Sequence, residues 1–427
     1  MRIATVFRAA FAAVGFTIAG GAIAQPVALK IWMHEHPPRI AIDRAIVAEF
    51  EKANPDIKIQ YDVVGVAEYA TKLLTAFAAG SGPDVFNQTS SLVAQYYNSR
   101  ITAPADFAAM GFADERAMMA AYSTGFTGIR FAGRLYGMPT EVSNYACYAN
   151  NALWKEAGLD PQKDFPKTWE AMVGVAEKLT QRDANGVPRR RGFDFNWTAP
   201  GAFWLTLNSM MHQAGGKLID EESYTATFNS EQGRRVLQFL VDYAVKHRLG
   251  GPQYTDSRTD FLAGKMATEC SFGIWGIPQM KTAKIDYSVH PAPRFAGGRD
   301  QGFDAYAFYM MVNARSPAAS QKAAWRYVRF YSDQATRLFE GAGLFVPRVD
   351  VAVKASDADS MVFLNELKIA GFSPRVVGYG QVLDTVMRGR DRMIQGGEKV
   401  EAVLPGLQDE VNAVLKRERA RAEAMRQ

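Results

Sequence analysis

The sequence predicts an α/β protein of two lobes, for three reasons. From residue 27 onward, segments with the two-residue period of a strand alternate with segments of helical period. The chain has 427 residues, more than one hydrophobic core usually organises. It contains no tandem repeat and no low-complexity linker, so we expect short ordered strands to join the lobes. A content of 48% hydrophobic and 22% charged residues excludes the disordered and fibrous classes.

Residues 1–24 have the features of a secretory signal peptide. Arg2 and Arg8 give a basic start, an apolar stretch interrupted by glycines follows, and the triplet Ala-Ile-Ala ends at Ala24. We expect cleavage before Gln25. A membrane anchor is the weaker alternative, because a spanning helix needs roughly 20 consecutive apolar residues. No cysteine stands near the cleavage point to carry a lipid, so we expect a periplasmic protein without a lipid anchor.

The charge and the cysteines limit the function further. The formal net charge is +5, and it falls to +3 when the two arginines of the signal peptide are removed, which is too little to indicate nucleic-acid binding. The two cysteines, Cys147 and Cys270, would meet an oxidising compartment, where a disulfide is permitted. Both stand in strand-like segments, where buried free thiols are equally common, so the sequence leaves their pairing open.

The first strand, helix and strand follow directly from the apolar pattern. Residues 27–33 alternate as a strand does, residues 42–53 carry apolar side chains at every fourth position, and residues 57–63 alternate again. Pro55 ends the helix. This order predicts a right-handed crossover between parallel strands.

The pattern then repeats, as expected for a doubly wound lobe. Residues 68–79 are predicted as a helix that Gly80 caps, and residues 83–86 as a short buried strand. In such sheets ligands bind beyond the carboxyl ends of the strands. Those ends lead here into the polar segments 34–39 and 87–91.

The second half of the chain predicts one more alternating run and several helices. Thr168 is expected to cap the helix that begins at Trp169. The strand-like run covers residues 144–150, and the helices cover residues 152–157, 169–179, 203–214 and 231–246.

One segment resembles a known family. Residues 261–268, Phe-Leu-Ala-Gly-Lys-Met-Ala-Thr, lead into a strand and then into Gly273-Ile-Trp275. This order resembles the most diagnostic segment of the family 1 extracellular solute-binding proteins of ABC importers, the maltose-binding-protein-like group. Other segments that fall in the order of that family are 50–55, 82–85, 135–139, 148–158, 166–169, 325–331 and 341–347.

The resemblance covers essentially the whole mature chain and implies a fold and a function. The fold would be the two-lobed periplasmic-binding-protein type II, whose lobes close on a solute by a hinge motion. The implied lobes are 27–139 with 306–350, and 140–305 with 351–427, with hinge crossings near 139–141, 302–306 and 349–350. The implied function is capture of a mono- or oligosaccharide and its delivery to the permease subunits of an ABC transporter, by a monomer with no catalytic residues, cofactor or metal.

Three aromatic residues are candidates for the ligand site. Trp275 stands at a strand end between two glycines. The resemblance implies that this tryptophan forms a stacking wall of the ligand cleft. A position in the hydrophobic core is the alternative. A sugar presents C–H groups that pack on a flat ring. Trp204 begins a helix and is as consistent with the core as with the ligand. Tyr379, between two glycines, resembles a late aromatic that caps the site in some relatives.

Polar candidates come from the loops and from the hinge. His34, Glu35 and His36 could hold a metal ion, but no nearby Cys or Asp completes a ligand set, so hydrogen bonding to ligand hydroxyls or plain solvation is favoured. Seven more polar residues stand either at the end of a strand or at the hinge crossings. Their side chains can donate or accept hydrogen bonds, so they either face the ligand cleft or hold the hinge strands together. These residues are Asn87, Gln88, Thr89, Glu141, Asn144, Asp304 and Tyr306.

Two alternative functions stay open from the sequence. The same family resemblance covers binders of glycerol phosphates, polyols and other small polar solutes, and a phosphate would need a cation such as Arg39. A periplasmic glycosidase would need two carboxylates, for which Glu141 and Asp304 are the candidates. The sequence does not identify the solute, its length or anomer, the permease, or whether the resting state is open or closed.

Overall fold

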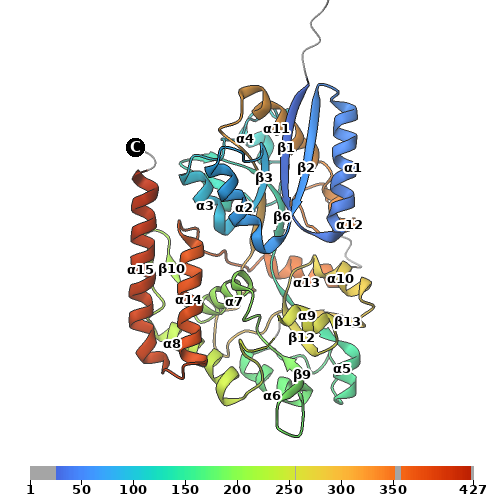
Figure 1. Cartoon of the computed structure of the whole chain (residues 1–427). Coiled ribbons are helices and arrows are strands. Elements are labelled where there is room, and N and C mark those ends of the chain that lie inside the picture. The colour runs from blue at the N-terminus through green and yellow to red at the C-terminus, as the bar shows by residue number, and fades with distance from the viewer. Residues whose placement is uncertain (1–25, 255, 352–356, 425–427) are drawn as a thin grey trace, which may run out of the picture.

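The computed structural model describes residues 26–254, 256–351 and 357–424. It confirms the predicted α/β class, because two five-stranded sheets, each packed with helices, form two lobes at opposite ends of the molecule (Figure 1). The predicted signal peptide lies outside the described residues, so its cleavage stays a prediction.

The first sheet has the strand order β2-β1-β3-β14-β6. Its strands are β1 (Val27–His34), β2 (Ile57–Val64), β3 (Val85–Thr89), β6 (Met138–Ser143) and β14 (Tyr306–Val312). β1 pairs in parallel with both β2 and β3, as the alternating pattern predicted. β14 enters from far along the chain and pairs antiparallel with β3 on one side and β6 on the other. The first lobe is therefore built from two distant parts of the sequence.

Helices cover this sheet, and the first of them begins earlier than predicted. α1 starts at Pro37 and not at Ile42, because the fixed φ of proline and its missing N–H suit the first turn of a helix. The polar segment 34–39 is thus helical from Pro37 onward. The helices and short elements of this lobe are α1 (Pro37–Ala53), α2 (Val66–Ala78), α3 (Ser90–Asn98), α4 (Glu115–Met119), η1 (Thr127–Ile129), β4 (Arg130–Phe131), β5 (Arg134–Leu135), α11 (Ala318–Ser332) and α12 (Ala335–Ala342).

The second sheet has the strand order β13-β7-β12-β9-β8. Its strands are β7 (Ala146–Asn150), β8 (Gln181–Arg182), β9 (Pro188–Phe193), β12 (Met266–Phe272) and β13 (Tyr287–His290). β7 lies antiparallel to both β12 and β13, whereas β12 lies parallel to β9. All seven residues of β12 are buried, which fits a strand covered on both faces.

The helices of the second lobe follow the predicted pattern with two differences. The Thr168 side chain accepts a hydrogen bond from the Ala171 N–H at 3.2 Å, so the predicted cap of α6 is confirmed. The helix predicted over 231–246 ends at Val241 and continues as the π-turn η2 (Asp242–Lys246). The helix predicted from residue 203 begins at Pro200, again with proline in the first turn.

The remaining elements complete this lobe. They are α5 (Asn151–Glu156), α6 (Trp169–Leu179), α7 (Pro200–Gln213), β10 (Ile219–Asp220), β11 (Thr225–Ala226), α8 (Glu231–Val241), α9 (Ser257–Leu262), α10 (Gly276–Thr282), α13 (Ala358–Leu367), α14 (Tyr379–Ile394) and α15 (Val400–Ala424). Figure 1 shows α14 and α15 side by side along one edge of the molecule, and α15 also reaches α3 of the first lobe.

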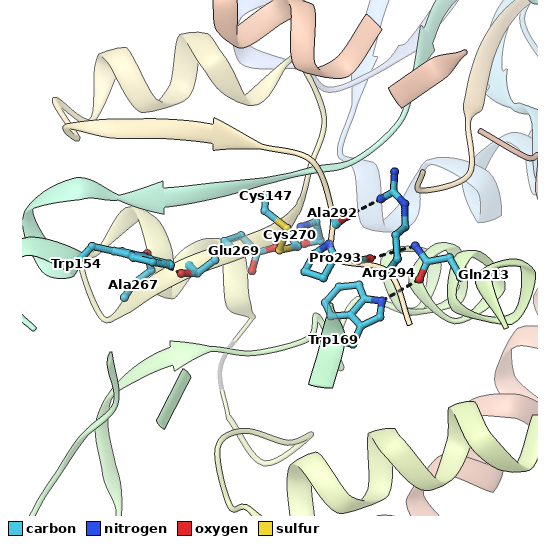
Figure 2. The surroundings of a disulfide bond; sticks show 12 residues. Cys147, Trp154, Trp169, Gln213, Ala267, Glu269, Cys270, Ala292, Pro293 and Arg294 are labelled. Atoms are coloured by element: carbon cyan, nitrogen blue, oxygen red, sulfur yellow. Dashed lines mark hydrogen bonds between the residues drawn. A yellow bond between two sulfur atoms is a disulfide. The ribbon is translucent and has the colours of Figure 1, made fainter. Parts of the chain in front are cut away.

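A disulfide joins two neighbouring strands of the second sheet (Figure 2). It links Cys147 of β7 to Cys270 of β12, which settles the pairing that the sequence left open. The ladder between these strands shifts register here, so that Cys270 and Ser271 together stand opposite Cys147. A bulge of this kind changes the direction in which side chains leave the strand. The disulfide therefore fixes β12 to β7 where the strand is irregular.

The chain passes between the lobes where it leaves one sheet and enters the other. β6 pairs with β14 up to Ser143, and β7 begins at Ala146 in the second sheet. The return passes through Ala305, which bridges to Phe372, and enters β14 at Tyr306. The residue ranges of the lobes stay a prediction, although the first sheet runs past residue 139, where its first segment was expected to end.

Candidate functional site

Trp275 lies where the two lobes meet. β12 ends at Phe272, a short turn follows, and α10 begins at Gly276. The half-buried indole packs against the hydrophobic cores of both lobes. Its Nε1 donates a hydrogen bond of 2.5 Å to the hydroxyl of Tyr306 on β14. A Cβ on Gly273 would lie 2.5 Å from this Nε1, so the glycine before the tryptophan makes room for the ring.

An arginine that the sequence did not single out lies beside this ring. Arg258 on α9 has its guanidinium carbon 5.2 Å from the centre of the Trp275 ring and 5.4 Å from that of Tyr145. Its Nε donates to the carbonyl oxygen of Ser271 at 2.9 Å, and its Nη2 donates to the hydroxyl of Tyr145 at 2.9 Å. Arg258 thus spans β12 and the start of β7, the two strands that the disulfide joins.

Glu269 is the second residue that the sequence analysis missed. Its Oε1 accepts a hydrogen bond from the Ser271 N–H at 2.7 Å, and Oε2 has no partner among the described residues. Burial raises the pKa of Glu269 to about 7, because the protein interior disfavours the charged form. A carboxylate inside an otherwise uncharged and fully buried strand is the signal that could have found it.

The Tyr306 hydroxyl that accepts from Trp275 also contacts Glu141 of β6. Asn144 follows β6, where the chain crosses from the first lobe to the second. Tyr306 donates a long hydrogen bond, 3.4 Å, to Glu141, and burial raises the pKa of this carboxyl to about 7. Asn144 donates to the carbonyl oxygen of Phe363 at 3.3 Å, while its Oδ1 has no partner among the described residues. The region between the lobes therefore holds carboxyl and amide oxygens with free hydrogen-bonding capacity.

Tyr379 and Trp204 form a second aromatic pair. Their rings meet edge to face with centroids 5.7 Å apart. Tyr379 is the first residue of α14 and is buried in the core of the second lobe. Trp204 is buried within the core of the second lobe, and its Nε1 has no partner among the described residues.

The cluster predicted at the end of β1 connects to this region through Phe308. His34 stacks on Phe308 with centroids 4.3 Å apart, and Phe308 meets Tyr306 edge to face. The Asn87 amide lies 2.6 Å from His34 Nδ1. Arg39 forms an ion pair with Asp43 at 3.0 Å inside the first lobe and donates to the His34 carbonyl oxygen.

The histidines of this cluster are buried and neutral. Burial lowers the pKa of His34 well below its usual value and that of His36 to about 4. His36 Nε2 lies 3.0 Å from the carbonyl oxygen of Ala342, whereas Glu35 is exposed. Among the described residues no group of three or more His, Cys, Asp or Glu side chains is arranged to hold a metal ion.

The other polar candidates have partners of their own. Gln88 donates to the Tyr96 hydroxyl at 3.3 Å, and Thr89 caps α3 by accepting from the Ser91 N–H. Asp304 is buried and accepts from His212 Nδ1 at 2.9 Å. The ligand roles of all these residues stay predictions.

Two hollows of this structure do not include Trp275 among their lining residues. The larger has a volume of about 590 Å³ and lies on the first lobe between α1 and α12, lined by Ile42, Thr336 and Gly341. The smaller, about 10 Å³, lies behind the disulfide next to Glu269 and Asn196. Side chains of the two lobes meet directly at Trp275.

The comparison with protein families decides what kind of protein this is. The model of the bacterial extracellular solute-binding protein family matches residues 36–336. The chain belongs to this family. Within the part of this solute-binding protein that the structure describes, none of the helices has the length and apolar character of a membrane span.

Individual relatives are distant. The chain is 20% identical over 388 residues to the maltotriose-binding protein of Pyrococcus abyssi, with 90% of this chain and 77% of the relative covered. It is 26% identical over 268 residues to the sn-glycerol-3-phosphate-binding periplasmic protein of Escherichia coli, with 60% of this chain and 58% of the relative covered.

Solved structures of solute-binding proteins have the same fold. The protein of an ABC transporter from Thermotoga lettingae, bound with α-D-tagatose, superposes with a TM-score of 0.80 at 22% identity over 91% of this chain and 100% of that one. The substrate-binding protein from Listeria monocytogenes in complex with cycloalternan gives 0.79 at 20% identity over 92% and 100%. At these identities the likeness establishes the two-lobed fold of this solute-binding protein.

Proposed function

We propose that this protein captures a carbohydrate between its two lobes in the periplasm and delivers it to the permease subunits of an ABC importer. The observation that carries the proposal is the position of Trp275, half-buried against both cores and flanked by carboxyl, hydroxyl and guanidinium groups. Relatives named for maltotriose, α-D-tagatose and cycloalternan support a sugar as the ligand.

The groups around Trp275 suit a sugar. The flat indole offers a face for C–H groups, and aromatic stacking contributes on the order of 1 kcal/mol beyond burial. The unpartnered oxygens of Glu269 and Asn144 can each accept a hydrogen bond from a hydroxyl. Hydrogen bonds to charged groups contribute about 1.5 to 3 kcal/mol each. One stacking contact and three hydrogen bonds to charged groups would together supply the roughly 8 kcal/mol that a micromolar affinity requires.

The connection between the lobes supports capture by closure. The chain passes between the sheets at Ser143 and Ala146 and again before Tyr306, so that few residues would have to change conformation. In this structure the Trp275–Tyr306 hydrogen bond and the packing of Trp275 against both cores hold the lobes together. A ligand would enter when these contacts open and would be covered when the lobes close again.

We further propose that the protein acts as a monomer and catalyses no reaction. The known relatives are binding proteins. A glycosidase would need two carboxylates about 5 to 9.5 Å apart, one acting as acid. Turnover of a chromogenic glycoside, lost in Glu141→Gln, would contradict this part of the proposal.

Thermal unfolding of residues 25–427 against mono- and oligosaccharides, polyols and glycerol phosphates tests the proposal. A ligand at 100 times its Kd adds about 2.7 kcal/mol to the free energy of unfolding. We expect a sugar to raise the Tm and Trp275→Phe to reduce the shift, because the smaller ring offers less stacking area.

Trp32→Phe is the matched control. This tryptophan lies on β1, between β2 and β3 of the first sheet, and its Nε1 donates to Asp62 of β2 at 3.1 Å, so its ring has a role within the first lobe. The ligand-induced shift should be unchanged in the control. A panel without any shift, or equal losses in both variants, would sink the carbohydrate proposal.

A further inference from the structure

We propose that the solute carries an anionic group, a carboxylate or a phosphate attached to a sugar or polyol, and that Arg258 is the residue that pairs with it. The inference rests on the proposed function, since it assumes that the region around Trp275 is the ligand site. It identifies both a chemical class of solute and a specificity-determining side chain.

The first step of the argument is the set of partners of Arg258. Its hydrogen bonds go to the carbonyl and hydroxyl oxygens of Ser271 and to the hydroxyl of Tyr145, all neutral. Within the described parts of the chain no carboxylate forms an ion pair with it. A guanidinium that is withdrawn from water without a counter-ion is unfavourable, so proteins normally supply one.

The other arginines show that this chain follows the usual rule elsewhere. Arg39, Arg191 and Arg390 are buried, and each forms an ion pair with an aspartate, Asp43, Asp194 and Asp391 respectively. Arg39 is already paired with Asp43 inside the first lobe, so we assign the anion-binding role that the sequence suggested for Arg39 to Arg258 instead. Arg258 differs from the three in lying beside Trp275, which packs against the cores of both lobes, and in keeping part of its side chain exposed.

Glu269 and Asp256 lie near Arg258, but among the described residues neither forms an ion pair with it. Glu269 is linked to it only through the Ser271 hydroxyl, which accepts from Arg258 Nε at 3.1 Å and donates to Glu269 Oε1. Burial raises the pKa of Glu269, and likewise that of Glu141, to about 7, so that each is only partly charged near neutral pH. The surroundings of Trp275 therefore keep a positive charge that a ligand anion can match.

The geometry also places this charge beside the aromatic platform. The guanidinium lies 5.2 Å from the Trp275 ring centre and packs over Tyr145 and Phe272 as well. Nε and Nη2 are used within the protein, while Nη1 donates no hydrogen bond to any described residue. A ring stacked on Trp275 could thus direct a charged substituent toward Nη1, and charge-assisted hydrogen bonds of this kind are the strong ones.

The test compares solutes that differ only in the anion. The probes are galactose and galacturonate, glucose and glucose 6-phosphate, and glycerol and glycerol 3-phosphate, measured by calorimetric titration with the full mature chain. We expect one anionic member to bind about tenfold more tightly than its neutral partner, or better. The uronate and phosphate arms distinguish the two sources of the charge. Added salt should weaken the anionic member more than the neutral one.

Arg258→Gln should remove this preference and leave the affinity for the neutral member nearly unchanged. Arg326→Gln is the control, since Arg326 is a partly exposed arginine on the first lobe whose ion pair with Asp56 is remote from Trp275. Arg258→Lys keeps the charge and serves if the glutamine variant does not fold, and the pairwise comparison in the unaltered protein needs no variant.

The outcomes separate the two proposals. Equal or tighter binding of the neutral member, with Arg258→Gln weakening both members alike, overturns the anionic inference and leaves carbohydrate binding intact. Binding of none of the six solutes, with no shift across the wider sugar panel, overturns both. An anionic preference that survives Arg258→Gln overturns the role of Arg258.

Discussion

Removal of the Cys147–Cys270 disulfide should lower the free energy of unfolding of the second lobe by several kcal/mol. The bond closes a loop with a sequence separation of 123 residues. The loss of chain entropy in the unfolded state for such a loop corresponds to about 4.9 kcal/mol at 25 °C. Strain or residual structure in the unfolded chain reduces the measured effect, so we expect a loss of about 3 to 5 kcal/mol in Cys147→Ala/Cys270→Ala.

Equilibrium unfolding in urea, followed by far-UV circular dichroism, measures this loss. The unaltered protein with a reducing agent is the matched control, since it breaks the same bond without changing the buried volume. Agreement between the two would assign the effect to the cross-link. A loss below about 1 kcal/mol in both would refute the entropic reasoning, because it would mean that the unfolded chain gains little freedom when the loop opens.

Three further predictions concern single residues. Gly273→Ala should cost about 1 to 3 kcal/mol of unfolding free energy, because the new Cβ would stand 2.5 Å from Trp275 Nε1; Gly201→Ala, with no atom within 4 Å, should cost nothing or stabilise α7 in the same urea titration. Thr168→Ala should cost about 1 kcal/mol, because α6 loses its cap, and an unchanged urea midpoint would contradict this. Burial raises the pKa of Glu269 in the folded protein from 4.5 to about 7, so the folded state binds the proton more tightly than the unfolded state. The stability that this group contributes is therefore present below about pH 4.5 and is lost as the pH rises through 7. Glu269→Gln should flatten the dependence of Tm on pH over that interval, and an unaltered pH profile would argue against the raised pKa.

Local patterns allowed much of the fold to be predicted. The alternation in β1 and β2 reports directly which faces are buried, and Thr168 has the side chain that a helix start requires. The start of α1 was misplaced because the apolar period begins only at Ile42, while the helix itself begins at Pro37. The end of α8 was misplaced because the sequence keeps its helical pattern through the π-turn.

The candidate site was harder to predict because it depends on which strands are neighbours. Cys147 and Cys270 pair because β7 and β12 lie side by side, and neither local sequence contains that information. Arg258 stands in a polar stretch and resembles a surface residue until α9 is seen to place it against Tyr145 and Ser271. Trp275 could be singled out because its glycine neighbours are next to it in the sequence.

The place of β14 in the first sheet sets an order of events during synthesis. β14 pairs with β3 and β6, yet it begins at Tyr306, after every strand of the second sheet has been made. Until then β3 and β6 each present an edge to which a strand of another molecule could add. Pairings so distant along the chain form slowly, because the intervening loop must close first. The first lobe therefore stays incomplete until β14 has emerged, although the other strands of its sheet are made before the second sheet.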